Sequence, residues 1–147
     1  MDHEKNLNGE KRFLYFAYGS NLHKNQMKSR CPDSIPLCSA ILSGWKLVEW
    51  FYADIERSEQ DSVNGALYLI SEKDLEPLDH YEGYPESYLR ESVQVKSSDG
   101  TVYQAMVYRM TDEYKRKMAH RKYTARYRAI CSMGADMWDL PNAFVQP

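Results

Sequence analysis

Two short segments hold the residues that could perform chemistry. The first ends an apolar run in a glycine and two polar residues, Tyr18-Gly19-Ser20-Asn21-Leu22. Ser and Asn are typical of helix starts, where unpaired N–H groups and the positive end of the helix dipole suit a carboxylate or a polarised carbonyl oxygen. The second segment places a carboxylate, Glu82, directly before Gly83. Glu82 is a candidate general acid and base, with a solvated carboxylate at a helix end as the alternative.

The first segment needs a strand before it and a helix after it. An aromatic and aliphatic run over 13–18 predicts a buried strand that ends at the turn around Gly19. The spacing after this turn predicts a helix over 22–30. A strand over 40–50 follows, and the polar residues 53–62 indicate a loop. A strand–turn–helix junction with a good cap is also an ordinary structural element, so the turn alone does not establish a ligand site.

Glu82 depends on a helix that begins near Ser71. Ser71 and Asp74 have the spacing of a helix-capping box. Pro77 lies inside the pattern, and it either separates two short helical turns or kinks one helix. Both arrangements place Glu82 at a helix end, with Gly83 available for a left-handed cap.

The order of the remaining elements indicates the fold class. We expect a buried strand over 63–70, an antiparallel pair over 88–95 and 101–108, and a last helix over 123–133. Strands and helices follow one another without regular alternation. This order favours an α+β fold over a doubly wound sheet.

The segments around Gly19 and Glu82 together resemble the γ-glutamylcyclotransferase-like family, with its AIG2-like and butirosin-biosynthesis cyclotransferase-like members. That family carries Y-G-S-N-L near its N-terminus and Glu-Gly after a short helix. The resemblance continues to the C-terminal residues Met133-Gly134-Ala135 and Leu140-Pro141. It implies a curved mixed β-sheet that closes toward a small barrel, with helices outside and the site at the strand–helix turns.

The resemblance also implies which residues contact a substrate. Backbone N–H groups of residues 19–22 would hold the glutamyl end, and Glu82 would be the general acid and base. Two tyrosines match family positions that line the pocket, although each could simply pack in the core. The expected substrate-binding residues are Tyr18, Gly19, Ser20, Asn21, Leu22, Tyr88 and Tyr127. The sequence departs from the family pattern at one place, where Tyr123-Thr124 stands instead of Pro-Ser. This difference at the pocket edge leaves the identity of the substrate open.

The reaction that the resemblance implies is intramolecular. The α-amine of an L-γ-glutamyl group attacks its own γ-carbonyl, closes a five-membered ring and expels an amine or amino acid. The other product is 5-oxoproline. Because nucleophile and electrophile share one molecule, the protein has to hold the reactive conformer and move protons. No protein nucleophile and no cofactor are required. A non-catalytic protein of the same fold that binds γ-glutamyl ligands is the alternative.

Length and composition indicate the class of chain. With 147 residues, of which 43% are hydrophobic, the sequence predicts one domain over 13–147 after a flexible leader over 1–12. This polar leader lacks the apolar centre of a signal peptide. Cys31, Cys38 and Cys131 form no C-x-x-C pair, which favours reduced thiols and a cytoplasmic protein. The histidines and cysteines show no metal-ligand spacing, so we expect no metal.

A basic segment over 115–128 indicates a further alternative. It contains seven Lys and Arg residues and no acid, interleaved with tyrosines. Basic and aromatic residues together can bind single-stranded nucleic acid, but the formal net charge of −2 does not favour such a partner. A solvated helix face and attraction of an acidic substrate are the other interpretations. We expect a small-molecule partner and no membrane partner, and the sequence is compatible with a monomer or a homodimer.

Overall fold

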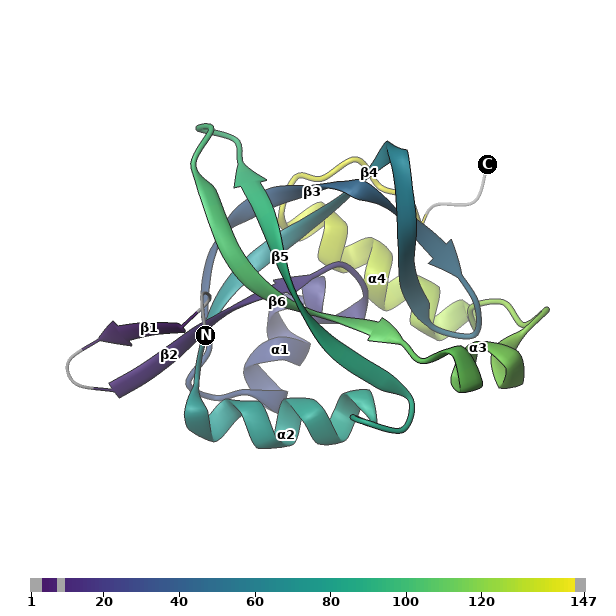
Figure 1. Ribbon diagram of the computed structural model, residues 1–147, viewed down its shortest axis with the longest axis horizontal. Coiled ribbons are helices and arrows are strands. Elements are labelled where there is room, and N and C mark those ends of the chain that lie inside the picture. Colours follow the sequence, from purple (N-terminus) through teal and green to yellow (C-terminus); the bar gives the residue numbers. More distant parts are fainter. Residues whose placement is uncertain (1–3, 8–9, 145–147) are drawn as a thin grey trace.

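The protein is built around one closed sheet. The computed structural model describes residues 4–7 and 10–144. Its strands are β1 (Glu4–Leu7), β2 (Glu10–Ala17), β3 (Ile35–Glu49), β4 (Ala53–Ser71), β5 (Tyr88–Ser97) and β6 (Val102–Met110). They lie in the order β1-β2-β4-β3-β5-β6, and a parallel contact between β2 and β6 closes the last five into a small barrel (Figure 1).

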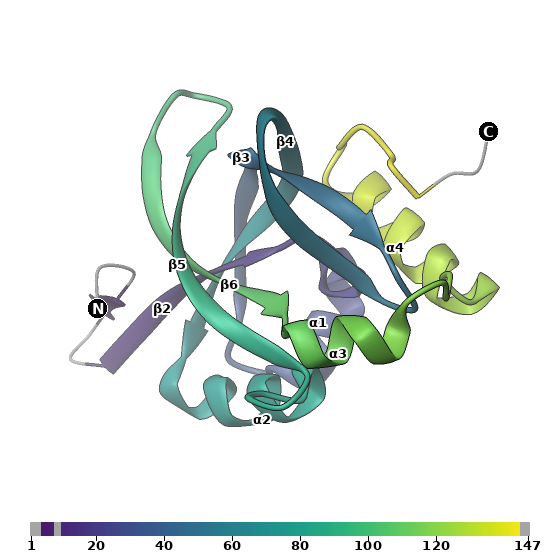
Figure 2. The same ribbon diagram turned by 45° about the vertical axis from the view of Figure 1, so that its right-hand side comes forward.

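The helices lie outside this barrel, as expected for the α+β class. They are the 3-10 turn η1 (Ser20–Leu22) and the helices α1 (Lys24–Arg30), α2 (Glu72–Glu82), α3 (Asp112–Met118) and α4 (Ala125–Met137). Turning the molecule shows that α3 leads directly to the start of α4 (Figure 2). In the part of the chain that the structure describes, no helix has the length and apolar character needed to span a membrane.

Strand β2 is buried on both faces, which accounts for its nearly continuous apolar sequence. Leu14, Phe16 and Tyr18 pack with residues of the other strands in the barrel interior. Phe13, Tyr15 and Ala17 alternate with them and pack with residues of the helices, among them Met27 and Leu78. The strand therefore joins the barrel core to the helical layer, and the turn that follows it, at Gly19 and Ser20, is partly exposed.

The structure differs from the sequence-based prediction in two segments. Residues 1–12 were expected to form a flexible leader, but β1 pairs with the start of β2 in an antiparallel hairpin, while residues 1–3 and 8–9 lie outside the described part. The predicted loop over 53–62 is the first half of β4. Residues 53–57 pair with β3 from Trp45 to Glu49, which satisfies backbone groups of a segment in which many side chains are polar and exposed.

Helix α4 fixes the turn that follows β2. Its last turn extends past the predicted end, and Thr124 caps its start by accepting a hydrogen bond from the Tyr127 N–H. Gly134 lies against η1 so closely that a Cβ there would be 2.5 Å from the His23 nitrogen and 2.7 Å from the Leu22 carbonyl carbon. The Trp138 indole N–H donates to the Leu22 carbonyl at 2.8 Å. The position of η1 therefore depends on a glycine in the facing helix.

This contact predicts the effect of Gly134→Ala. Alanine in place of glycine inside a helix normally adds up to about 1 kcal/mol of stability. Here the methyl group has to displace the η1 backbone, and we expect the free energy of unfolding to fall by about 1–3 kcal/mol. Urea denaturation of the purified variant measures the change, and Met133→Ala, at an exposed position of the same helix, is the control. A more stable Gly134→Ala protein would contradict the packing argument.

Candidate active site

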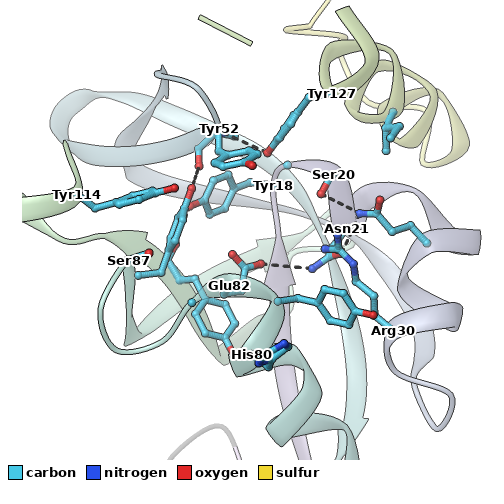
Figure 3. Close-up of a pocket in the computed structure, with 18 of the residues that line it drawn as sticks. Tyr18, Ser20, Asn21, Arg30, Tyr52, His80, Glu82, Ser87, Tyr114 and Tyr127 are labelled. Carbon is cyan, nitrogen blue, oxygen red and sulfur yellow. Dashed lines mark hydrogen bonds between the residues drawn. The ribbon is translucent and has the colours of Figure 1, made fainter. Parts of the chain in front are cut away.

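A pocket of about 420 Å³ opens where β2 and α2 end (Figure 3). Its lining residues come from the end of β2 and the turn after it, α1, the residues around the start of β4, the end of α2, the start of β5, β6, α3 and the first turns of α4. The structure brings together seven of the eight residues that the sequence singled out. These are Tyr18, Gly19, Ser20, Asn21, Glu82, Tyr88 and Tyr127.

Leu22 is the exception. Its side chain is buried in the helix-side core and does not line the pocket. Its backbone N–H donates to the Gly19 carbonyl at 3.1 Å, so it is already used inside η1. The N–H groups of Ser20 and Asn21 begin this turn, and within the described residues no protein group accepts from them. Of the backbone N–H groups of residues 19–22 that were expected to contact a substrate, that of Leu22 is therefore not available.

Helix α2 carries Glu82 into the pocket. Ser71 and Asp74 form the predicted capping box, and the helix continues through Pro77 to Glu82. Near its end, Asp79 accepts a hydrogen bond from the Tyr108 hydroxyl and forms an ion pair with Arg90 at 3.2 Å. These contacts tie the end of the helix to β5 and β6.

Gly83 then ends the helix in the left-handed conformation, with a φ of 71°. A residue with a Cβ adopts this φ rarely. Its N–H donates to the His80 carbonyl at 3.1 Å. The helix therefore stops directly after Glu82, as the sequence predicted, and leaves this side chain at the pocket (Figure 3).

Asn21 connects Glu82 to the turn. Its side-chain amide nitrogen donates to the Tyr15 hydroxyl at 3.1 Å and to Glu82 Oε1 at 3.4 Å. Its amide oxygen accepts from Arg30 at 3.0 Å and from Gln26 Nε2 at 3.2 Å. Since both donors of α1 contact the oxygen, the amide has to present its nitrogen to Glu82. Arg30 and Gln26 thus orient Asn21.

Burial is the main influence on the Glu82 carboxyl. It raises the pKa of Glu82 to about 7. The positive charge of Arg30 opposes this increase, and the negative charge of Asp79 adds to it. A carboxyl group with a pKa near neutrality can both accept and release a proton at physiological pH. The environment of Glu82 therefore favours acid–base chemistry over the alternative of a solvated carboxylate.

Tyr88 of β5 and Tyr127 of α4 both line the pocket, and both form a hydrogen bond with the backbone of Ala53. The Tyr88 hydroxyl donates to the Ala53 carbonyl at 2.7 Å, and the Tyr127 hydroxyl accepts from the Ala53 N–H at 3.1 Å. A Cβ on Gly19 would lie 3.0 Å from the Tyr127 hydroxyl and 3.2 Å from the Ala53 Cβ. Glycine therefore leaves space between the turn, the Tyr127 hydroxyl and the Ala53 side chain.

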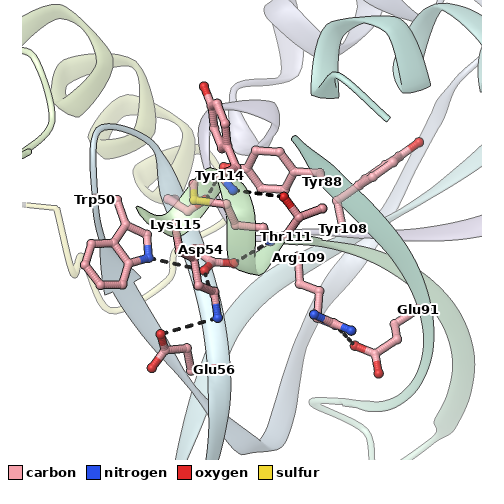
Figure 4. A network of polar contacts seen from close by, with 12 residues as sticks. Trp50, Asp54, Glu56, Tyr88, Glu91, Tyr108, Arg109, Thr111, Tyr114 and Lys115 are labelled. Carbon is pink, nitrogen blue, oxygen red and sulfur yellow. Dashed lines mark hydrogen bonds and ion pairs between the residues drawn. The ribbon is translucent and has the colours of Figure 1, made fainter. Parts of the chain in front are cut away.

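Asp54, the residue after Ala53, holds this part of the pocket wall in place through its buried side chain. Its side chain is fully buried and accepts hydrogen bonds from the Met110 N–H at 2.8 Å and the Trp50 indole at 3.2 Å. Lys115 of α3 lies 3.8 Å away and also pairs with Glu56 (Figure 4). One carboxylate therefore joins the start of β4, the end of β6 and α3. This network holds Ala53 where the two tyrosines meet it.

Sequence reasoning missed several residues of the pocket. Arg30 comes from α1, outside the inner face that the sequence suggested for this helix through Leu22, Gln26 and Met27. Tyr52 lies in the hairpin connection between β3 and β4. Tyr15 alternates with residues of the barrel interior, which is the signal that could have placed it on the helix side. The other missed aromatic residues are Tyr81, Tyr108 and Tyr114. Over residues 4–7 and 10–144, no three His, Cys, Asp or Glu side chains form a group that could hold a metal ion.

The fold is an α+β barrel whose pocket combines a half-buried carboxylate with free N–H groups of a helical turn, a combination that is typical of sites for small ligands. The sequence profile described as Gamma-glutamyl cyclotransferase, AIG2-like matches residues 15–129. The chain therefore belongs to the γ-glutamylcyclotransferase family, which confirms the resemblance seen in the sequence.

Individual relatives agree with this assignment. Proteins named Gamma-glutamylcyclotransferase from Homo sapiens and Mus musculus are 30% and 28% identical over 145 residues, which cover 90% of this chain and 74% of each relative. A solved structure named Gamma-glutamyl cyclotransferase superposes with a TM-score of 0.76 at 28% identity, over 88% of this chain and 82% of that one. A yeast γ-glutamyl cyclotransferase specific to glutathione, at 15% identity and a TM-score of 0.60, has the same fold.

The raised pKa of Glu82 predicts a pH-dependent stability difference. Because this pKa is above that of an unfolded glutamate, the folded state binds more protons between about pH 4.5 and 7, and its stability falls as the pH rises through that range. Glu82→Gln removes the titrating carboxyl group and therefore this pH-dependent loss of stability. We expect the variant to gain about 3 kcal/mol over wild type at pH 8 and little at pH 4.

Urea denaturation at the two pH values tests this expectation. Glu76→Gln, an exposed position of the same helix, is the matched control for the loss of one carboxylate. The same stability difference between Glu82→Gln and wild type at both pH values would mean that the Glu82 carboxyl is not perturbed by burial.

Proposed function

We propose that this protein is a γ-glutamylcyclotransferase that converts an L-γ-glutamyl group into 5-oxoproline and releases an amine or amino acid. The observation that carries the proposal is Glu82, a half-buried carboxyl group with a pKa of about 7 that faces a pocket beside a turn with free N–H groups. A protein that only binds its ligand does not need a group that exchanges protons at neutral pH. The names of the relatives support the same reaction.

The glutamyl end of the substrate lies against η1. The N–H groups of Ser20 and Asn21 donate to an oxygen of the substrate, either its carboxylate or the γ-carbonyl on which negative charge develops. Gly19 leaves the space for this approach, since any Cβ there would contact Tyr127 and Ala53. The pocket then holds the α-amine and the γ-carbonyl in the conformer that can close the ring.

Glu82 moves the proton. It accepts a proton from the α-ammonium group, and the free amine attacks the γ-carbonyl carbon. A new C–N bond forms and the original amide C–N bond breaks. Glu82 passes this proton, and then a second one from the ring nitrogen, to the departing nitrogen, so 5-oxoproline keeps one N–H and the amine leaves as an ammonium ion. Asn21 holds Glu82 Oε1 during both transfers, and Arg30 keeps the Asn21 amide in the required orientation.

Glu82→Gln tests the role of the carboxylate. Glutamine keeps the shape of the side chain and an oxygen that can accept from Asn21, but it cannot take up a proton. We expect turnover to fall by about 10²–10⁴-fold, while binding of the substrate is retained. Mass detection of 5-oxoproline gives the rate, and calorimetry gives the dissociation constant. Turnover within a few-fold of wild type would exclude Glu82 as the acid and base.

A panel of substrates tests the reaction itself. L-γ-glutamyl amino acids and amines should give 5-oxoproline, after subtraction of the spontaneous reaction without protein. The N-acetylated counterparts have no nucleophile, and α-linked glutamyl compounds offer no equivalent five-membered closure, so both should give none. Release of the amine half from an N-acetyl-γ-glutamyl compound would mean hydrolysis and would exclude the cyclisation mechanism. Failure of every γ-glutamyl compound to react would support the non-catalytic alternative.

A further inference from the structure

Positive charge is concentrated beside the pocket. The segment 115–128 contains seven of the 19 Lys and Arg residues and none of the 21 Asp and Glu residues of the chain. It runs from α3 into the first turns of α4, which lie next to each other at one side of the molecule (Figure 2). The rest of the chain is therefore acidic, and this side alone would attract an anion.

Most of these cations have no acidic partner. Lys115 pairs with Asp54 and Glu56, and Arg128 pairs with Glu49 at 2.6 Å. Within the described residues, the other five cations of the segment form no ion pair, namely Arg116, Lys117, Arg121, Lys122 and Arg126. Cations of one segment that form no ion pair repel one another, and an anionic ligand would offset this repulsion.

One of the five lines the pocket, and a second lies near one of the lining residues. Arg126 lines it, together with Thr124 and Tyr127 of the same region. Arg121 lies over the Phe51 ring at 5.7 Å. Burial raises the pKa of the pocket residue Tyr114, and the nearby charge of Arg121 opposes that increase.

These cations belong to the side of the pocket that does not bind the glutamyl end. Tyr52 and Tyr114 lie across the pocket from Arg30, and Tyr127 lies between them and the turn at Gly19 and Ser20 (Figure 3). Since the glutamyl end is held at η1 and Glu82, the departing half of the substrate has to extend toward the tyrosines. Its terminal groups then come within reach of Arg121 and Arg126.

We propose that the departing half is an amine with at least two carboxylates: an acidic amino acid or a chain of γ-linked L-glutamates. This inference rests on the proposed cyclotransferase function. A neutral departing amino acid supplies one carboxylate, whereas two free cations border this side. In a γ-linked chain, release of the first residue as 5-oxoproline frees the α-amine of the next, which has its own γ-carbonyl. The same bond exchange then repeats from that end.

Binding to the Glu82→Gln protein tests the proposal without turnover. Calorimetry compares γ-L-glutamyl-L-glutamate with γ-L-glutamyl-L-glutamine, which has the same shape and one carboxylate fewer. We expect the glutamate compound to bind roughly fivefold more tightly at low salt and the preference to shrink as salt is added. Adding Arg126→Gln or Arg121→Gln should reduce this preference. Adding Lys96→Gln, which removes an exposed cation of β5 away from the pocket, should leave it unchanged.

Each outcome separates the possibilities. Equal affinity for the two dipeptides, or a preference that survives both arginine substitutions, would overturn the proposal. Tighter binding of a single-stranded oligonucleotide at physiological salt, lost in the same two variants, would assign the surface to nucleic acid instead. A binding preference that depends on the arginines, with no 5-oxoproline formed by wild type, would support the anion site and refute the catalytic function.

Discussion

The proposed mechanism requires that the Glu82 carboxyl group is kept from water without being neutralised by a close cation, and several contacts around it meet this requirement. Burial at the end of α2 raises its pKa, while Arg30 is directed to the Asn21 amide and does not form an ion pair with Glu82. If Arg30 contacted the carboxylate directly, the pKa would fall and the group would lose its capacity to exchange protons at neutral pH. An amide between the two charges keeps this capacity.

A second requirement is that elements far apart in the sequence meet at Ala53. Tyr88 of β5 and Tyr127 of α4 bind its backbone, and the buried Asp54 secures it to β6 and α3. None of these contacts uses the side chain of Ala53. The two tyrosines of this wall are thus held by backbone atoms of Ala53, the first residue of β4. The local sequence gives little indication of such a role.

The features that the sequence predicted well are local ones. The turn at Gly19, the capping box at Ser71 and the left-handed cap at Gly83 each depend on a few neighbouring residues, and all three are found. Pairing between distant segments was harder to predict. Polar residues of β4 were interpreted as a loop because their partner strand could not be seen, and Arg30 was missed because it reaches the site only through helix packing. Membership of the family supplied the pocket tyrosines, which composition alone could not separate from core residues.

The hydrogen bonds to Ala53 leave Tyr88 and Tyr127, two chemically identical side chains, with different hydrogen-bonding capacity toward a ligand. A phenol hydroxyl has one proton to donate and lone pairs to accept with. Tyr88 has given its proton to the Ala53 carbonyl, so it can offer only an acceptor to a ligand. Tyr127 accepts from the Ala53 N–H and keeps its own proton for donation. The backbone of Ala53 therefore leaves one tyrosine hydroxyl that can only accept a hydrogen bond and one that can donate. A bound amide, with its N–H and its carbonyl, is the kind of group that can satisfy both.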